Sequence, residues 1–166
     1  LGLLLAGQVA AAKSVEAALP SIAKLAEAGA QTIRNGGRLF YAAAGSSGLM
    51  ALADALEMPG TFGIPQSRIV ILFAGGVAAL EDMVGGVEDD RDQARADVLS
   101  KSISSKDLLI SVSASGTTPY AMAAMETAKV HGAKTAGIAN NAGSPLLNAA
   151  DFPVHLPTPP EVLAGS

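Results

Sequence analysis

The stretch RLFYAAAGSSGLMALADALEMPGTFG, residues 38–63, decides the fold of this chain. A short apolar run leads into the turn GSSG at 45–48. An Ala- and Leu-rich segment follows, which predicts a helix that ends near Glu57, before MPG at 58–60. A strand, a Gly/Ser turn and a helix in this order form a phosphate cradle, because free N–H groups and the positive end of the helix dipole favour an anion. The residues expected to contact the phosphate are Gly45, Ser46 and Ser47.

The spacing of this turn separates it from two common phosphate loops. It lacks the GxGxxG spacing of dinucleotide-binding turns, and no lysine follows it as in a P-loop. On these residues alone, an ordinary helix N-cap after a buried strand is the alternative interpretation.

Five short apolar runs, separated by segments with helical periodicity, predict the architecture. Apolar runs without alternation are typical of strands buried on both faces, and the helices between them supply the crossovers of a parallel sheet. We therefore expect an α/β fold, a doubly wound, mainly parallel five-stranded sheet with helices on both faces and ligands at the carboxyl ends of the strands. The runs lie at 39–44, 69–73, 108–112, 135–138 and 152–156.

The residues before the first run have a helical period of their own. Residues 7–34 predict one or two amphipathic helices, with a break at Pro20-Ser21 and a stop at Gly36-Gly37. We therefore divide the chain into an N-terminal helical segment, 1–35, and a ligand-binding domain, 36–166, which together form one compact unit. An apolar helix of this length either packs on a partner subunit or covers its own sheet.

A second Ser/Gly turn follows the third apolar run and repeats the design of the first. The sequence SASGTTP at 113–119 places hydroxyls and free N–H groups where a helix begins. Two such turns at equivalent ends of a parallel sheet favour a phosphorylated small ligand, although Ser115 and Thr118 would also suit a mere helix cap. The residues expected to contact the ligand are Ser113, Ser115, Gly116, Thr117 and Thr118.

Composition and charge exclude several classes of function. The 166 residues carry a net charge of −4 without a basic run, so nucleic acid is not an expected partner. The absence of cysteine excludes disulfides and thiolate chemistry and favours the cytoplasm. No basic region precedes the apolar start of the chain, so we expect no signal peptide and no membrane anchor. No cluster has metal-ligand spacing, and we expect neither a metal nor a cofactor.

At this point several motifs, taken together, resemble a known family. The chain is similar to the SIS (sugar isomerase) domain superfamily and, within it, to the N-acetylmuramic acid 6-phosphate etherase family, from about Gly36 to the last residue. The motifs that match in order and spacing are GRLFYAAAGSSG, DALEMPGTFG, AGG, VEDD, SASGTTPY, NNAGSPL and the closing PEVLAGS.

The resemblance implies a function and two catalytic glutamates, Glu57 and Glu88. The family is a carbon–oxygen lyase that converts N-acetylmuramic acid 6-phosphate and water into N-acetylglucosamine 6-phosphate and D-lactate. The C2 proton leaves, lactate leaves C3, and water adds. Two carboxyl groups can supply the base and the acid for this reaction without a cofactor. We assign Glu57 as the acid at the ether oxygen and Glu88 as the base at C2, and the opposite assignment stays open.

Local sequence bears on both roles. The negative end of the helix dipole near Glu57 disfavours the charged form of its carboxyl group. The negative charges of Asp89 and Asp90 disfavour the charged form of Glu88 in the same way. Eleven residues of continuous helix would separate Ser46 from Glu57 by about 16 Å. Either the helix ends early, or Glu57 serves the pocket of a neighbouring subunit, which predicts a homodimer with sites near the subunit interface.

The chain also departs from the family pattern, and this keeps two alternatives open. Leu49 and Thr117 stand where the family usually has arginine, the bidentate partner of phosphate and carboxylate, and Val77 replaces a glutamate. A non-catalytic sugar-phosphate sensor built on the same domain is one alternative. An aldose–ketose phosphate isomerase, which also needs only carboxylate proton transfer, is the other.

Overall fold

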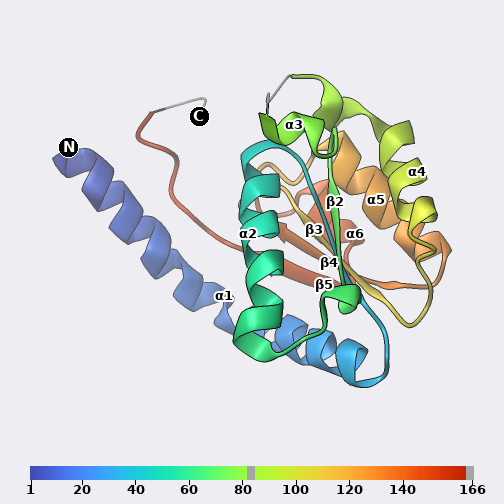
Figure 1. Ribbon diagram of the computed structural model, residues 1–166. Coiled ribbons are helices and arrows are strands. Elements are labelled where there is room, and N and C mark those ends of the chain that lie inside the picture. The colour runs from blue at the N-terminus through green and yellow to red at the C-terminus, as the bar shows by residue number, and fades with distance from the viewer. Residues whose placement is uncertain (82–84, 164–166) are drawn as a thin grey trace.

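A computed structural model describes residues 1–81 and 85–163 of the protein, and it contains the expected α/β fold (Figure 1). The five strands are all parallel and pair in the order β2-β1-β3-β4-β5. They are β1 (Leu39–Ala43), β2 (Ile69–Phe73), β3 (Leu108–Val112), β4 (Lys134–Ala139) and β5 (Phe152–His155). Each predicted run therefore forms a strand, and no boundary differs by more than one residue.

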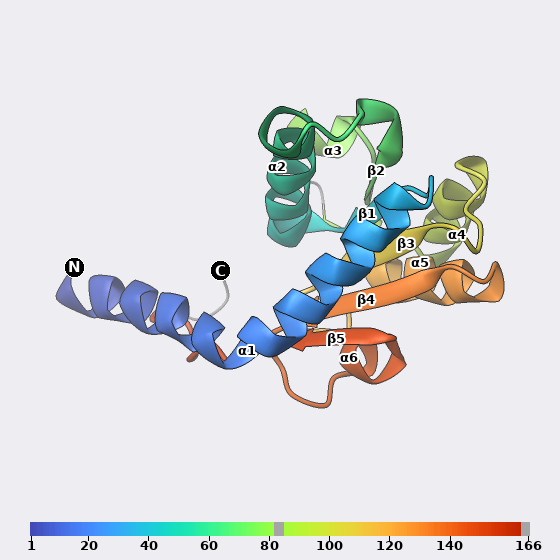
Figure 2. The same cartoon turned by 90° about the horizontal axis from the view of Figure 1, so that it is seen from below.

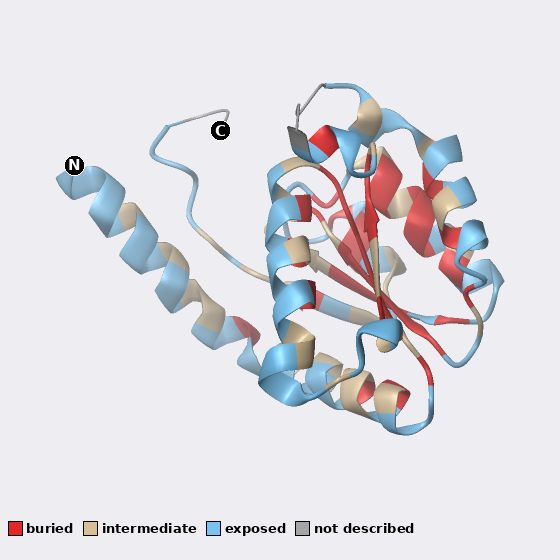
Figure 3. Ribbon diagram, in the orientation of Figure 1, coloured by how far each residue is buried: buried red, intermediate tan, exposed pale blue. Residues whose placement is uncertain are grey.

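Helices cover both faces of this sheet. The helices are α1 (Gly2–Arg34), α2 (Gly45–Phe62), α3 (Ala78–Glu81), α4 (Arg91–Ser100), α5 (Pro119–Val130) and α6 (Pro145–Ala149). Two short 3-10 turns, η1 (Gln66–Arg68) and η2 (Val87–Asp89), precede β2 and α4. Figure 3 shows the buried residues concentrated along the strands and on the helix sides that face them.

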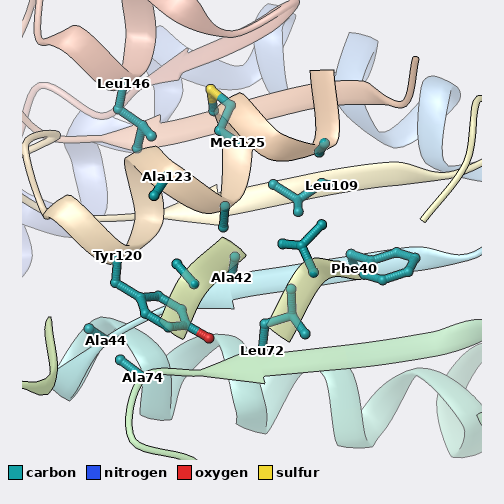
Figure 4. Close-up of a cluster of buried hydrophobic side chains, with 14 of the residues drawn as sticks. Phe40, Ala42, Ala44, Leu72, Ala74, Leu109, Tyr120, Ala123, Met125 and Leu146 are labelled. Atoms are coloured by element: carbon teal, nitrogen blue, oxygen red, sulfur yellow. The ribbon is translucent and has the colours of Figure 1, made fainter. Parts of the chain in front are cut away.

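The first layer of the core lies between the sheet and helices α4, α5 and α6. Phe40, Leu109 and Met125 are fully buried in this layer (Figure 4). Tyr120, at the start of α5, is also fully buried, and its hydroxyl donates to Asp97 of α4 at 2.6 Å. Desolvation by burial and, after it, the hydrogen bond to Asp97 raise the pKa of Tyr120 far above its ordinary value. Tyr120 is therefore a core residue.

The second layer lies between the opposite face of the sheet and helices α1 and α2. Leu39, Leu108 and Ile110 pack there against Ala28 of α1 and Ala55 of α2. The helix α2 approaches the sheet very closely at Gly48, because a Cβ atom there would lie 2.5 Å from the ring of Phe73. The second glycine of GSSG is thus required by helix–strand packing rather than by a turn.

The predicted end of α2 is wrong, and the break predicted at Pro20 is absent, because α1 is the single helix that was one alternative for residues 7–34. The helix α1 continues through Pro20 as one helix, and Figure 2 shows it changing direction midway, as a helix kinked by an internal proline does. The helix α2 continues through Pro59 and ends only at Phe62, where Gly63 adopts φ 65°. Met58 and Ile64 pack against the second core layer, and this packing holds the last turn of α2 on the sheet despite the proline.

The N-terminal half of α1 extends past the sheet, whereas its C-terminal half lies across it (Figures 1 and 2). By length and composition α1 could cross a membrane, a test that core helices of soluble proteins and signal sequences also pass. The chain after β5 runs beside this N-terminal half of α1. The two segments approach closely at Gly7, because a Cβ atom there would lie 3.1 Å from the side chain of Val162.

The strand order fixes where a ligand site is expected. The chain reverses direction across the sheet between β1 and β3, which are neighbours. In open parallel sheets such a switch point is the preferred place for ligands, at the carboxyl ends of the strands. The turns at 45–48 and 113–118 follow β1 and β3. Both predicted phosphate turns therefore lie at the switch point.

Candidate functional site

The GSSG motif forms the first turn of α2 rather than a turn before it. Ala44 is the N-cap residue in extended conformation, without a side-chain cap, and the first helical bond runs from the Gly48 N–H to its carbonyl at 2.9 Å. The N–H groups of Gly45, Ser46 and Ser47 therefore have no partner within the helix. Ser46 is exposed and Ser47 is half-buried. The turn presents free donors at the positive end of an 18-residue helix.

Glu88 lies against this helix start. The carboxylate oxygen Oε2 of Glu88 is 4.0 Å from the position that a Cβ atom on Gly45 would occupy. Both residues line a cavity of about 150 Å³, whose walls are formed by Gly45, Phe73, Ala74, Ala79, Gly85, Val87 and Glu88. The structure thus brings together one predicted catalytic residue and one predicted phosphate turn, 43 positions apart in the sequence.

The second turn is organised by the hydroxyl of Ser113. This buried oxygen lies 2.7 Å from the hydroxyl of Thr118 and 3.2 Å from that of Ser115, and it accepts the N–H of Gly116 at 3.1 Å. The hydroxyl of Ser115 in turn accepts the N–H and the hydroxyl of Thr117. Thr118 is the N-cap residue of α5 but makes no side-chain capping bond. The helix-cap interpretation of Ser115 and Thr118 is therefore wrong, and the hydroxyls instead hold one another in a network.

Gly116 is required at the apex of this turn. Its φ is 71°, and a Cβ atom would lie 2.2 Å from the hydroxyl oxygen of Ser144. The Ser144 hydroxyl is buried and has no hydrogen-bond partner among the described residues. The Asn141 amide also reaches the turn and donates to the carbonyl of Ser115 at 3.2 Å. These supporting contacts from the loop after β4 were not predicted, because only the motif NNAGSPL indicated that the loop mattered.

A larger cavity, of about 680 Å³, opens beside the second turn. Its walls come from the turns after β3 and β4, from the N-terminal half of α1 and from the C-terminal segment, which we define as residues 156–163. Asn140 anchors this segment, since its amide donates to the hydroxyl of Thr158 at 2.8 Å and to the carbonyl of Leu156 at 3.3 Å. Polar lining residues are Gln8, Ser115, Asn140, Asn141, Thr158 and Glu161. The motif PEVLAGS forms part of this wall, but its last three residues, 164–166, lie outside the described part of the chain.

Glu57 is not brought to either turn. It is exposed on α2, and because the helix is continuous, eleven residues place it about 16 Å along the axis from Ser46. It also lies before the last turn of α2, so the argument that the helix dipole disfavours its charge does not hold. Leu56, beside it, is also exposed.

The described residues that line the two cavities at the carboxyl edge are acidic or uncharged. Within the described part of the chain, no lysine or arginine lines either cavity, whereas Glu88 lines the smaller one and Glu161 the larger one. Leu49 and Thr117, at the positions where arginine was expected, are exposed and supply no cation. Among the residues that the structure describes, no group of three or more His, Asp or Glu side chains is arranged to hold a metal ion. A phosphate at this edge would rest on N–H groups and hydroxyls.

Comparison with known proteins identifies relatives over almost the whole chain. An N-acetylmuramic acid 6-phosphate etherase from Deinococcus radiodurans is 44% identical over 159 residues, which are 96% of this chain and 52% of the relative. An etherase of the same name from Bacteroides thetaiotaomicron is 41% identical over 155 residues, 93% of this chain and 56% of the relative. The chain thus spans about half the length of the curated relatives it matches.

The fold comparison and the family model agree with this result. A phosphoheptose isomerase from Francisella tularensis superposes with a TM-score of 0.70 at 21% identity, over 98% of this chain and 84% of that one. This likeness supports the fold alone. The family model described as the SIS domain matches residues 8–140, which is most of the chain. The chain therefore belongs to the SIS domain family.

Proposed function

We propose that this protein is a sugar-phosphate etherase that cleaves the lactyl ether of N-acetylmuramic acid 6-phosphate. The products are N-acetylglucosamine 6-phosphate and D-lactate. The names of the relatives at 41–44% identity support this substrate. The observation that carries the proposal is the position of Glu88, whose carboxylate lies against the helix start that carries GSSG, at the switch point of the sheet.

The proposed reaction is an elimination followed by hydration. The N–H groups and hydroxyls of the turns at 45–48 and 113–118 hold the phosphate of the open-chain sugar. Glu88 takes the proton from C2, next to the aldehyde, and the bond from C3 to the ether oxygen breaks as Glu57 protonates that oxygen. Water then adds to C3 of the unsaturated aldehyde, and a proton returns to C2. One substrate and one water thus give one amino sugar phosphate and one lactate.

Glu57 can take part only if it comes from a second copy of the chain. In one chain it lies about 16 Å from Ser46 along α2, on an exposed face that also carries large apolar side chains. These exposed apolar residues of α2 are Leu49, Met50, Leu56 and Phe62. We therefore propose a homodimer in which the exposed face of α2 packs on the partner and delivers Glu57 to the site that holds Glu88 of the other chain. The compartment we propose is the cytoplasm.

A non-catalytic sugar-phosphate sensor is a second candidate, and one observation favours it. The cavities at the carboxyl edge have no lysine or arginine among their described lining residues. Without a cation, the carboxylate of a lactyl group has no bidentate partner there, whereas a sugar phosphate that lacks a carboxylate needs only the N–H groups and hydroxyls that hold its phosphate.

The test is D-lactate release from N-acetylmuramic acid 6-phosphate by the wild-type protein and by Glu57→Gln and Glu88→Gln. Release by the wild type, reduced at least about a hundredfold in both variants, supports the etherase. Glu16→Gln, a neutralisation on the exposed side of α1, serves as the matched control and should keep full activity.

Mixing the two inactive variants tests the shared site. In a mixed dimer one site has both glutamates intact and the other has neither. Since half of the dimers are mixed, about a quarter of the wild-type activity should return. If nothing returns, both glutamates act within one chain and the shared-site proposal is wrong. No release, with a sugar phosphate still raising Tm, would favour the sensor, and a ketose phosphate product would identify an isomerase.

A further inference from the structure

The two cavities at the carboxyl edge of the sheet differ in the size of the ligand that they can hold. The cavity beside Glu88 has a volume of about 150 Å³, whereas the one beside Ser115 has a volume of about 680 Å³. Pockets that bind small organic ligands measure about 300–1,000 Å³. The larger cavity therefore has the volume for a whole sugar phosphate, and the smaller one has room for only a part of it.

The lining of the larger cavity combines apolar walls with a few polar groups. Leu4, Gly7 and Ala11 lie on one face of α1, because they are spaced by three and four residues. The loops after β3 and β4 supply polar side chains, among them Ser115 and Asn141. Sites for small molecules generally have this composition, in which the polar groups fix the orientation of the ligand. The apolar residues that the C-terminal segment adds to the lining are Pro159, Pro160, Val162 and Leu163.

Asn140 joins the second Ser/Gly turn to the C-terminal segment. Its backbone N–H donates to the carbonyl of Ala114, inside the turn, at 3.0 Å. Its side-chain amide donates to the hydroxyl of Thr158 at 2.8 Å and to the carbonyl of Leu156 at 3.3 Å. The carbonyl oxygen of Asn140 lies 3.1 Å from Nε2 of His155, at the end of β5. One residue therefore connects the turn that is expected to hold phosphate with the segment that forms a wall of the cavity.

The C-terminal segment is stiff, and it leaves the sheet at a tight turn. The Thr158 N–H donates to the carbonyl of Leu156 at 2.7 Å, so Pro157 is the middle residue of a three-residue turn. Prolines at 157, 159 and 160 restrict the φ angles of the segment. The segment then runs beside the N-terminal half of α1 (Figure 1), where a Cβ atom on Gly7 would lie 3.1 Å from the side chain of Val162. A stiff segment that is fixed at its first residues is a preformed wall.

The hydrogen bonds of the Asn140 side chain bear directly on ligand affinity. A wall that is already in place costs little conformational entropy when a ligand binds, whereas a loose segment must be ordered at that moment. Loss of these hydrogen bonds would therefore weaken every ligand that contacts the C-terminal segment. It would not weaken a ligand that contacts the turn at 113–118 alone.

We propose that the C-terminal segment is a clamp on the ligand site and that Asn140 is the positioning residue that holds it in place. The ligand is an acylated amino sugar phosphate: its phosphate rests on the turn at 113–118, and its acyl side lies in the larger cavity. The methyl group and the amide of the acyl group match the apolar walls and the polar loops of this cavity. This inference rests on the proposed function for its sugar phosphate ligand, but it does not depend on cleavage of the lactyl ether.

The test compares the affinities for N-acetylglucosamine 6-phosphate and for inorganic phosphate by isothermal titration calorimetry. Asn140→Leu keeps a similar shape and removes both side-chain hydrogen bonds, so the affinity for the sugar phosphate should fall at least about tenfold. The affinity for inorganic phosphate, which needs only the turn, should stay within about twofold of the wild-type value. Thr158→Val removes one of the two hydrogen bonds and should have a smaller effect on the sugar phosphate.

Asn148→Leu is the matched control for these variants. The amide of Asn148 donates to the carbonyl of Gly143 at 2.8 Å, and this residue does not line the larger cavity. The control variant should bind both ligands as the wild type does.

A covalent tether separates positioning from direct contact with the ligand. The chain has no cysteine, and Gly7 and Val162 approach closely enough for Gly7→Cys/Val162→Cys to form a single disulfide. When this pair is added to Asn140→Leu, oxidation should restore the affinity for the sugar phosphate to within about threefold of the wild-type value, because the disulfide holds the segment in place of the lost hydrogen bonds. Reduction of the disulfide should remove the gain.

Three results would overturn the proposal. Unchanged binding of the sugar phosphate by Asn140→Leu would show that no clamp is needed. A loss that the disulfide does not restore would mean that Asn140 touches the ligand itself, and an equal loss for both ligands would mean that it supports the turn instead of the segment. A wild type that binds neither ligand would overturn this inference and the sugar-phosphate function together, whereas binding without D-lactate release would contradict the etherase alone.

Discussion

Single residues in the turn at 113–118 act through backbone shape as much as through their functional groups. Gly116 is the clearest case, since its φ of 71° and the 2.2 Å between an added Cβ atom and the Ser144 hydroxyl both exclude a side chain. The network around Ser113 depends on this geometry, because the Gly116 N–H is one of its donors. The turn is thus preorganised by packing against the loop after β4.

Gly116→Ala should lower the free energy of unfolding by about 2–4 kcal/mol, because backbone strain and a steric overlap add. Gly143→Ala is the matched control: its φ is 67°, but an added Cβ atom meets nothing within 4 Å. It should cost only the strain, about 1–2 kcal/mol. Urea unfolding of the three proteins measures both values. Equal losses in the two variants would show that Ser144 does not constrain the turn.

At the scale of elements, the sequence predicted the strands well, but it placed the end of α2 and a break in α1 wrongly at their prolines. Strands buried on both faces need continuous apolar runs, and the runs at 39–44 and 108–112 therefore predict buried strands directly. Proline, in contrast, has a local cost of about 3 kcal/mol in a helix, which tertiary packing can outweigh. At Pro59 the contacts of Met58 and Ile64 with the sheet decide the outcome, and they cannot be read from the local sequence.

The same limit applies to the site. The two phosphate turns followed from glycine and hydroxyl patterns at strand ends. The approach of Glu88 to Gly45 and the contact of Ser144 with Gly116 join residues 43 and 28 positions apart, and they depend on how the loops fold back. Only the family resemblance identified Glu57 and Glu88 as important, whereas the length of helix between Ser46 and Glu57 already indicated that a continuous helix keeps Glu57 about 16 Å from the first turn.

The starts of β1 and β3 are joined by the Arg38–Asp107 pair, which makes their pairing sensitive to acid. Because the folded pKa of Asp107 is lowered, its contribution is complete above the pKa of the unfolded chain, about 3.9, and disappears as the pH falls through the lower folded value. Asp107→Asn should lower the free energy of unfolding at pH 7 by about 3 kcal/mol, because Arg38 loses its buried partner.

Urea unfolding between pH 7 and pH 2 checks this prediction. The difference between the wild type and Asp107→Asn should be constant above about pH 4 and should shrink below it. Asp92→Asn, on the exposed Arg95–Asp92 pair, is the control and should change stability little at any pH. A difference that does not shrink in acid would mean that packing, rather than the charge of Asp107, supplies the stability.

On the scale of the whole molecule, the site around Glu88 at the carboxyl edge of the sheet is distinct from the exposed apolar side chains of α1 and α2. Both α2 and the first half of α1 carry several exposed large apolar side chains, and surfaces of this kind are typical of interfaces where the side chains form a contiguous patch. One of those on α2, Leu56, is next to Glu57, the residue that lies about 16 Å from the phosphate turn of its own chain. Dimer formation and catalysis therefore depend on the same face of α2 in the proposed function.

This dependence gives a prediction that separates assembly from chemistry. Leu56→Glu places a charge on the proposed interface and leaves both glutamates in the sequence. It should shift the protein from dimer to monomer in sedimentation velocity, and the same variant should lose D-lactate release. Val130→Glu, an equally apolar-to-charged change at the exposed end of α5, should leave both unchanged. If Leu56→Glu were monomeric and still fully active, Glu57 would not act across the interface, because a monomer holds it about 16 Å from the phosphate turn. If the wild type were already a monomer with activity, the acid would have to come from another group near Glu88.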